Sequence, residues 1–306
     1  MNQSLWRECM TLCVVLASAQ SSVGQASPQA PQVPLKRDYL PGEAIAYRMK
    51  AVNQGHLRTI RYEAQATARV RREEPPAPFV EDFAWTDLIL NGQSVPLTAA
   101  SQQFREGLSL SPEYTLSVPD LSKVQPILIG PITDLLTFYA DVQLAMRQST
   151  LLRAGDHVYV KHSTPNSWAD GTYTIFGQDS IDFDITLASL DQTTKVATVI
   201  VRHVPPAQPH ISFPAPWMLQ PVGNLPNNWA EVAKGDQGKY LAQIGKETFE
   251  VMIKLSLPSG RILSAEMDNP VEVLERECDD AALLKCGAPL RYSIRRQVAL
   301  LAEKPE

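Results

Sequence analysis

The sequence has little positive charge and no run of basic residues. Its 28 lysines and arginines are outnumbered by 33 aspartates and glutamates, which gives a formal net charge of -5. A nucleic-acid-binding face needs clustered basic side chains to neutralise phosphates, and a polybasic membrane anchor needs the same. The composition therefore argues against both kinds of partner.

The sequence motifs of common enzymes are also missing. The chain contains no Gly-x-Ser-x-Gly elbow, no His-Glu-x-x-His pair, no phosphate-binding loop and no Gly-x-Gly-x-x-Gly turn. The tetrapeptide Ala169–Thr172 (ADGT) is better interpreted as a hairpin turn, because Asp170-Gly171 suits two positions that need positive φ. We therefore predict no catalytic residue, no cofactor and no metal site, and we favour a non-catalytic protein over an enzyme.

Long hydrophobic runs are scarce as well. The run near the N-terminus, Met10–Ala19 (MTLCVVLASA), has the length of a signal-peptide core and is too short to span a bilayer. Small residues follow it, and the next residues are rich in serine, glutamine, alanine and proline. We expect export to the periplasm or the cell exterior and no transmembrane segment. The predicted parts are a signal peptide at 1–26, a flexible spacer at 27–41 and a single β-rich domain at 42–306.

Cysteine is rare, with four in the chain, and Cys9 and Cys13 would leave with the signal peptide. The other two, Cys278 and Cys286, stand in the stretch CDDAALLKC. Two nearby cysteines in an exported chain favour one structural disulfide that closes a short loop. The aspartates between them are hard oxygen donors that match thiolates poorly, and a redox pair has a tighter spacing.

Period-two alternation dominates the rest of the sequence. In the stretch Thr59–Arg71 (TIRYEAQATARVR), every second residue from Ile60 to Val70 is apolar, and the residues between them are polar or charged. A strand sorts such residues onto one dry and one wet face, as in antiparallel sheets. The alternation recurs at Ile181–Leu187 and at Phe249–Leu257, after which Pro258-Ser259-Gly260 predicts a hairpin turn.

Three segments break this rhythm. Apolar residues recur at helical spacing after Gly130-Pro131, which predicts one amphipathic helix over about 131–147. The stretch NNWAEVAKG predicts a second, short helix that ends at Gly235. Seven prolines between Pro205 and Pro226 exclude a central strand, so we expect a proline-rich loop at 205–228 that carries large apolar side chains.

These elements predict a mainly β protein of the α+β type. Its long antiparallel sheet would curl or form an open barrel, and its apolar face must be covered. The amphipathic helix and the proline-rich loop are the available covers.

The expected domain opens with the stretch YLPGEAIAYRM, which follows the export signal and precedes a long alternating strand. Through this layout and through Pro41, Gly42, Glu43 and Tyr47, the chain resembles exported bacterial β-rich proteins of unknown function. Its layout is also similar to that of periplasmic half-barrel carriers of lipoproteins, although no diagnostic motif of the carriers is present. The resemblance implies at most a carrier or binder of apolar groups.

Small residues on one face of a predicted strand leave two interpretations open. Ala64, Ala66 and Ala68 form a low floor, on which the helix could pack closely. The other interpretation is an apolar pocket for a small molecule, a lipid or part of an envelope protein, and such pockets often lie at barrel mouths. The candidate ligand-binding residues are Ala64, Ala66, Tyr139, Trp168, Phe213, Trp217 and Trp229.

The best alternative site is the polar stretch Gly155–Tyr173 (GDHVYVKHSTPNSWADGTY). Its two histidines, His157 and His162, are separated by an odd number of residues, which places them on opposite faces of one strand. A hydrolase or metal-dependent enzyme using His157, His162 and Asp170 therefore needs His162 to turn in a loop. Nearby, Asp182 and Asp184 share a face that we expect to be solvated, with calcium binding as its alternative.

From the sequence we expect an exported, non-catalytic protein that binds or carries a hydrophobic molecule or an envelope partner. The enzyme just described is the first alternative. A structural interaction module of the cell envelope is the second.

Overall fold

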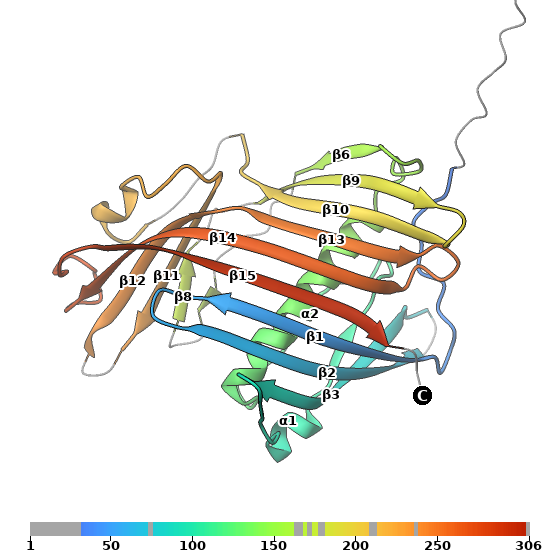
Figure 1. Ribbon diagram of the computed structural model, residues 1–306, viewed down its shortest axis with the longest axis horizontal. Coiled ribbons are helices and arrows are strands. Elements are labelled where there is room, and N and C mark those ends of the chain that lie inside the picture. The colour runs from blue at the N-terminus through green and yellow to red at the C-terminus, as the bar shows by residue number, and fades with distance from the viewer. Residues whose placement is uncertain are drawn as a thin grey trace, which may run out of the picture. The chain divides into compact units, whose positions relative to one another are not determined.

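The computed structural model describes residues 32–72, 76–161, 168–169, 173–176, 181–207, 213–235 and 238–303, with the backbone alone at 168–169 and 173–176. Its strands form one antiparallel sheet that is not closed into a barrel (Figure 1). Two α-helices accompany the sheet in these residues. The predicted mainly β, antiparallel class with an open sheet is confirmed.

The strands follow the order β4-β3-β2-β1-β15-β14-β12-β11-β8-β7. Strand β14 also pairs with β13, which leads on to β10, β9 and β6, and β5 pairs with β3. The strand bounds are β1 (Ala44–Gln54), β2 (Thr59–Arg72), β3 (Phe79–Leu90), β4 (Gln93–Ser94), β5 (Glu106–Leu108), β6 (His157–Val160), β7 (Trp168–Ala169), β8 (Tyr173–Phe176), β9 (Asp182–Asp191), β10 (Val196–Val204), β11 (Asn227–Lys234), β12 (Tyr240–Glu247), β13 (Phe249–Ser256), β14 (Ile262–Cys278) and β15 (Leu290–Glu303).

The sheet forks at β14. Its first part pairs with β13 through the predicted hairpin, and its last part, from Val271 to Cys278, pairs with β12. Only Thr248 separates β12 from β13. We call β7, β8, β11 and β12, with the adjoining ends of β14 and β15, the side lobe, and we call the rest of the sheet the main half (Figure 1).

A proline in β14 explains the position of the fork. The backbone N–H of Thr248 donates to the carbonyl of Pro270 at 3.2 Å, but Pro270 has no N–H to return the bond. The side chain of Asn269 takes over this role, since its Nδ2 donates to the Thr248 carbonyl at 2.8 Å. The strand pairing is thus interrupted here without leaving the Thr248 carbonyl unsatisfied.

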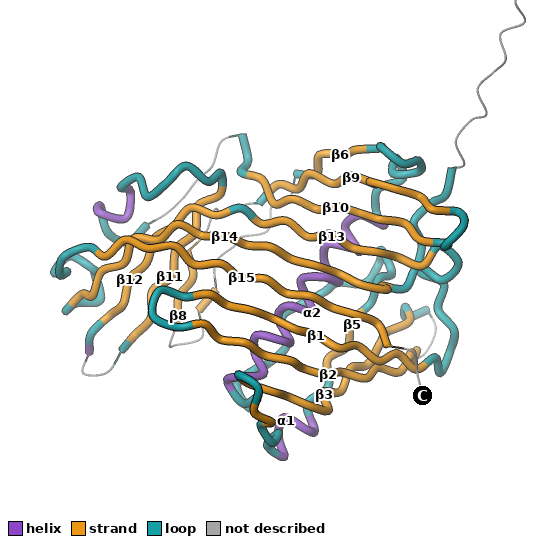
Figure 2. The backbone as a smooth tube through the Cα atoms, in the orientation of Figure 1, coloured by secondary structure: helices purple, strands orange, loops and turns teal. Residues whose placement is uncertain are grey.

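Helix α2 (Pro126–Met146) crosses one face of the main half obliquely (Figure 2). Its buried side chains, among them Leu135, Phe138 and Tyr139, belong to the larger hydrophobic cluster of the sheet. The predicted start near Pro131 was wrong, because Pro126 already occupies the first turn and Pro131 lies inside the helix, buried. Short helix α1 (Ala99–Gln103) was not expected; the Thr98 side chain caps its N-terminus.

By length and composition, α2 is long and apolar enough to cross a membrane, which the sequence analysis did not anticipate. More than half of its most apolar window is buried inside the protein. It also carries Asp134 and Asp141, both of which contact basic side chains of the sheet. These features are typical of a core helix.

A smaller hydrophobic cluster covers the side lobe on the opposite face of the sheet. Its Leu274 is an even-numbered residue of β14, whereas Met267, which belongs to the larger cluster, is odd-numbered, and alternate residues of a strand face opposite sides. The covers are a 3-10 turn (Pro216–Leu219) in the proline-rich loop and the loop closed by the predicted disulfide, Cys278–Cys286. Trp217 Nε1 donates to the Leu283 carbonyl at 2.8 Å and joins these two covers.

The prediction of a short helix that ends at Gly235 is wrong. The residues form β11, which pairs with β12 along its whole length and with β8 over part of it. Ala230 is fully buried in the smaller cluster while its neighbours are only partly buried. Tertiary pairing has overridden the helical propensity of the alanines here.

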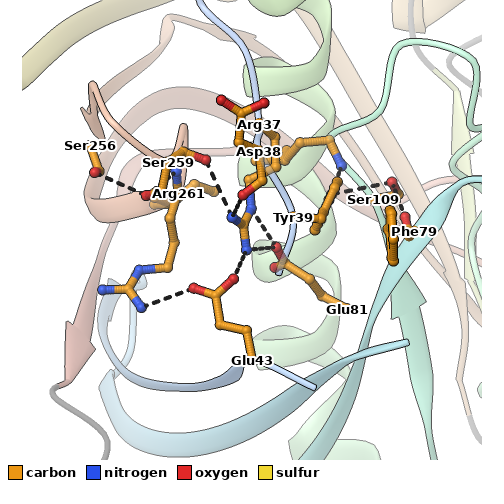
Figure 3. A network of polar contacts seen from close by, with 12 residues as sticks. Arg37, Asp38, Tyr39, Glu43, Phe79, Glu81, Ser109, Ser256, Ser259 and Arg261 are labelled. Atoms are coloured by element: carbon orange, nitrogen blue, oxygen red, sulfur yellow. Dashed lines mark hydrogen bonds and ion pairs between the residues drawn. The ribbon is translucent and has the colours of Figure 1, made fainter. Parts of the chain in front are cut away.

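The predicted flexible spacer is anchored from Gln32 onward. Arg37 lies between two carboxylates, at 2.8 Å from Glu43 and 3.0 Å from Glu81, and its side chain is 1% exposed (Figure 3). The backbone N–H of Asp38 donates to the Ser259 carbonyl at 2.9 Å. A buried ion pair therefore fastens the segment before β1 to the end of the sheet.

The stretch YLPGEAIAYRM has structural roles at this end of the molecule. Gly42 adopts a φ of +78° that favours glycine, and Glu43 contacts both Arg37 and Arg261. Tyr47 is buried and its hydroxyl donates to the Ile262 carbonyl at 3.2 Å.

Candidate functional site

The predicted ligand-binding residues lie in separate places. Ala64, Ala66 and Tyr139 are buried in the larger cluster, together with the apolar side chains of α2. Their exposed fractions are 2% or less, so the alanine floor is closed by packing. The hydroxyl of Tyr139 donates to Glu81.

The aromatic residues of that prediction are divided between the two faces of the side lobe. Phe213 and Trp217 pack against the smaller cluster. Trp229 faces the other way, one residue before buried Ala230, and lies so close to Gly245 that an added Cβ there would be 2.8 Å from its ring. The side chain of Trp168 lies outside the described residues. The structure therefore does not bring the described members of this set into one pocket.

Of the residues predicted for the enzyme alternative, His162 and Asp170 lie outside the described residues. His157 is on β6, half exposed, and contacts the carboxylate of Asp184. Asp182 and Asp184 do share the face opposite Phe183 and Ile185, but Asp182 is buried and accepts a hydrogen bond from Tyr159. The expected solvated face is thus only partly open to solvent.

A polar cluster that the sequence analysis missed lies at the fork, between α2 and the sheet. We call it the fork cluster. Its members come from β2, α2, β10, β11, β12, β14 and β15, and they are Tyr62, Asp134, Asp141, His203, Asn227, Glu247, Asn269 and Arg296.

One part of the fork cluster is an ion pair on α2. Asp134, with a side chain 2% exposed, accepts hydrogen bonds from Arg296 and from the hydroxyl of Tyr62. Burial raises the pKa of Asp134, while the Arg296 guanidinium and the Tyr62 hydroxyl act in the opposite direction. Both carboxylate oxygens of Asp134 thus have partners within the protein.

The second part is centred on His203. Its Nε2 lies 3.4 Å from Oδ1 of Asp141, which is two helical turns after Asp134 on the same face of α2. The His203 ring stacks on Phe249, with centroids 4.2 Å apart, and meets Phe183 edge to face at 4.8 Å. Aromatic surface therefore lies directly beside a buried carboxylate.

Glu247 lies between these two parts. It accepts a hydrogen bond from Asn269 Nδ2 at 2.9 Å. Burial raises the pKa of Glu247, and the Asn269 amide and the charges of His203 and Arg296 oppose that rise. His203 and Arg296 thus both act on Glu247, which links the two parts into one cluster.

Several buried polar atoms of the fork lack a hydrogen-bond partner among the described residues. They are Oδ2 of Asp141, Oδ1 of Asn227, Nε of Arg296 and, on the neighbouring strand β1, Oδ1 of Asn53, which is paired in register with Arg296. Asp141 is 3% exposed and Asn227 is 4% exposed. The side chains of Arg296 and His203 are 34% and 15% exposed, so these two members of the cluster are partly open to solvent. Most of these unpaired atoms are acceptor oxygens that lack a hydrogen-bond donor.

Two shallow depressions lie elsewhere on the surface. One, of about 320 Å³, is on the main half, where Val52, Met252 and Ala299 lie among charged side chains. The other, of about 290 Å³, lies between the turn that joins β1 to β2 and the start of β15, beside Leu57 and Tyr292. His56 stacks on Tyr292 there, with centroids 4.9 Å apart.

The side chains of the fork cluster offer charges, hydrogen bonds and aromatic surface. Within the described part of the chain, no group of three or more His, Cys, Asp or Glu side chains is arranged to hold a metal ion. The contacts found for His203 are with Asp141, Phe183, Phe249 and Asn227, and none of these is a nucleophile of the serine or cysteine type.

No family model matches the chain, and comparisons with curated proteins and with solved structures also found no match.

Sequence reasoning could have found part of the cluster. Asp134 and Asp141 are the two charged residues of a mainly apolar helix and are seven residues apart, so they share the face that packs on the sheet. A pair of carboxylates on a buried face demands partners. The partners themselves come from distant strands, and only the fold brings them together.

Proposed function

We propose that this protein is an exported, non-catalytic binding protein that holds a small amphiphilic molecule at the fork cluster. The observation that carries the proposal is the set of buried, unpaired acceptors on Asp141, Asn227 and Asn53. Each buried polar atom without a partner costs about 1–3 kcal/mol, against a total stability of about 5–15 kcal/mol for a typical domain. A bound molecule that supplies donors would remove this cost.

The surroundings favour a ligand with an apolar part. Phe249 and Phe183 flank His203 and are themselves only partly buried. A site with aromatic walls and a few convergent polar groups is the usual arrangement of small-molecule sites. The predicted export rests on the apolar leader, and the Cys278–Cys286 disulfide supports it, because disulfides persist in oxidising compartments.

Mass spectrometry of small molecules extracted from natively purified protein tests the proposal. We expect a molecule to co-purify with the wild type and with the His157→Ala variant, whose exposed histidine lies on the opposite face of the sheet. The His203→Ala variant should lose it while keeping a cooperative thermal transition. Absence of any bound molecule in the wild type, or equal retention in both variants, would refute the proposal. Ordered water satisfies such atoms too, and it leaves no extractable molecule.

A second candidate function is an interaction module that binds an envelope protein through the face of the main half opposite α2. The depression at Met252 favours it, since this side chain is 37% exposed and lies beside Val52 and Ala299. In that case Met252→Arg should abolish a stable complex recovered from the native host. The same variant should leave the small-molecule content unchanged.

The enzyme alternative at His157, His162 and Asp170 stays a prediction, because two of its three residues lie outside the described part of the chain.

A further inference from the structure

The loop closed by the disulfide, residues 279–285, holds one leucine in the interior of the side lobe. Leu283 is 1% exposed and belongs to the smaller hydrophobic cluster, together with Cys278. Its φ of +55° lies in the left-handed region, which is unfavourable for a residue with a Cβ. Such a conformation persists only where the surrounding structure imposes it. The bridge between Cys278 and Cys286 fixes both ends of the loop and is the covalent part of this constraint.

The second cover of the side lobe depends on the position of that leucine. Trp217 Nε1 donates to the Leu283 carbonyl, and the indole has no other polar atom. The guanidinium of Arg276 lies 5.2 Å from the centre of the indole. Trp217 belongs to the 3-10 turn Pro216–Leu219, whose Met218 is 1% exposed in the same cluster. Displacement of Leu283 would therefore deprive this turn of the hydrogen bond that joins it to the disulfide loop.

These covers can open without the main half. The smaller and the larger hydrophobic clusters share no member among the described residues, and α2 packs in the larger one. Parts of a protein with few buried contacts open at a lower free energy than the whole domain does. The far end of the proline-rich loop stays tied to the sheet, because Arg291 donates to the carbonyls of Pro221 and Val222 at 3.4 and 3.3 Å.

The two sulfur atoms of the bridge differ in their access to solvent. Cys278 is fully buried, whereas Cys286 is partly exposed and stands between exposed Lys285 and Gly287. An external thiolate therefore attacks Sγ of Cys286, the S–S bond breaks, and Cys278 leaves and takes up a proton. The second thiol of a dithiol reductant then attacks the mixed disulfide and frees Cys286 as a thiol. The bridge gains two electrons, and the dithiol is oxidised to a disulfide.

We propose that the Cys278–Cys286 bridge is a redox-sensitive switch, whose reduction by a dithiol uncovers the apolar face of the side lobe. Reduction frees the loop that holds Leu283, and the turn at Trp217 then loses its acceptor. The main half stays folded. The switch is independent of the ligand proposed for the fork cluster. The uncovered face carries Ala230, Ala242, Ile244 and Leu274.

The bridge outweighs the other contacts of its loop. Joining the ends of a loop of this length favours the closed form by roughly 30- to 150-fold. Both oxygens of Asp280 accept hydrogen bonds, from the backbone N–H groups of Leu284 and Lys285 at 2.9 and 3.0 Å. These bonds survive reduction, but they lie at exposed residues, where water replaces a lost partner at small cost.

Thiol alkylation and hydrogen exchange of the purified protein, both followed by mass spectrometry, test the proposal. In dithiothreitol without denaturant, Cys278 and Cys286 should both become alkylated. Amide exchange in residues 213–222 and 279–287 should then be faster than in the oxidised protein by about tenfold or more, while exchange in α2 changes by less than about twofold. A bridge that resists reduction, unchanged exchange at 213–222, or an equal acceleration in α2 would overturn the proposal.

Two variants separate the bridge from the hydrogen bond. The double variant Cys278→Ala with Cys286→Ala should exchange at 213–222 as the reduced wild type does, and a further increase with dithiothreitol would count against the switch. If it does not fold, reoxidation of the wild type replaces it, and exchange that stays fast after reoxidation contradicts the proposal. Trp217→Phe removes the indole N–H, so 213–222 should exchange faster in the oxidised protein while 279–287 stay protected. Unchanged protection of 213–222 would show that the bond to Leu283 does not couple the covers, which also overturns the proposal.

Discussion

Glu106 allows a quantitative test of the electrostatics of the interior. It lies on β5, is 2% exposed, and neither of its carboxylate oxygens has a hydrogen-bond partner among the described residues. Burial raises the pKa of Glu106 from 4.5 to about 8. At neutral pH the folded protein therefore carries a proton on this residue, whereas the unfolded chain does not.

The direction of the pH dependence follows from this difference. Between pH 4.5 and about 8 the folded state binds one more proton at Glu106 than the unfolded state does. The free energy of unfolding therefore falls as pH rises, by about 1.4 kcal/mol for each pH unit. Between pH 4.5 and about 8 the free energy of unfolding falls by roughly 5 kcal/mol in total. Below pH 4.5 both states hold the proton, so Glu106 no longer makes the stability depend on pH.

The perturbation is Glu106→Gln, which keeps the shape and removes the ionisable group. A glutamine amide in the same place has unpaired donors, with a cost of about 1–3 kcal/mol at every pH. The variant should therefore be more stable than the wild type by roughly 2–4 kcal/mol at pH 8. At pH 4.5 it should be equal or less stable.

Urea unfolding at several pH values between 4.5 and 8 measures these free energies by linear extrapolation. Glu113→Gln is the control, because it makes the same change on an exposed side chain. The difference between variant and wild type should grow with pH for Glu106→Gln and stay flat for the control. A difference that does not vary with pH would refute the reasoning, since it would show that Glu106 ionises normally in the folded state.

Three further predictions concern the N-terminal anchor and the disulfide. Arg37→Met should lower the free energy of unfolding by about 3–5 kcal/mol, because it leaves buried Glu81 without its ion-pair partner, whereas Lys36→Met on an exposed side chain should change it by less than about 0.5 kcal/mol in the same urea assay. Gly260→Ala should be destabilising by more than about 2 kcal/mol, since φ is +66° and the new Cβ would be 1.8 Å from the Lys36 carbonyl oxygen. Its thermal transition should fall below that of Gly238→Ala, which has a similar φ but open space, and equal transitions would exclude the close approach. Reduction of Cys278–Cys286, a separation of eight residues, should cost about 2–3 kcal/mol by loop-closure entropy, and unchanged stability under reductant would show that the bridge does not constrain the unfolded chain.

The accuracy of the sequence predictions depends on how local the determining interaction is. In β2, Ala64, Ala66 and Ala68 alternate with polar residues, and all three are buried as predicted. The hairpin at Gly260 and the Cys278–Cys286 bridge were also predicted correctly. In each case a few neighbouring residues carry the signal, through side-chain period, turn conformation or short loop closure.

The errors arose where distant partners decide the outcome. The stretch Asn227–Lys234 looks helical alone, but pairing with β12 makes it a strand. Helix α2 begins at Pro126 instead of near Pro131, and Pro131 lies buried inside the helix, where it packs in the interior. The anchor at Arg37 depends on Glu81, 44 residues away, and no local pattern announces it.

By itself, the sequence determined the antiparallel β class, the covering helix, the proline-rich loop and the disulfide, because hydrophobic period, proline content and cysteine spacing act over short stretches. Only the tertiary structure decided that the alanine floor is closed by packing and that the sheet forks at Thr248. It also gathered Asp141, His203 and Glu247 into one cluster. The physical reason is that the side chains packed around a buried charge determine its environment. Here α2, β10 and β12 supply those side chains from separate parts of the chain.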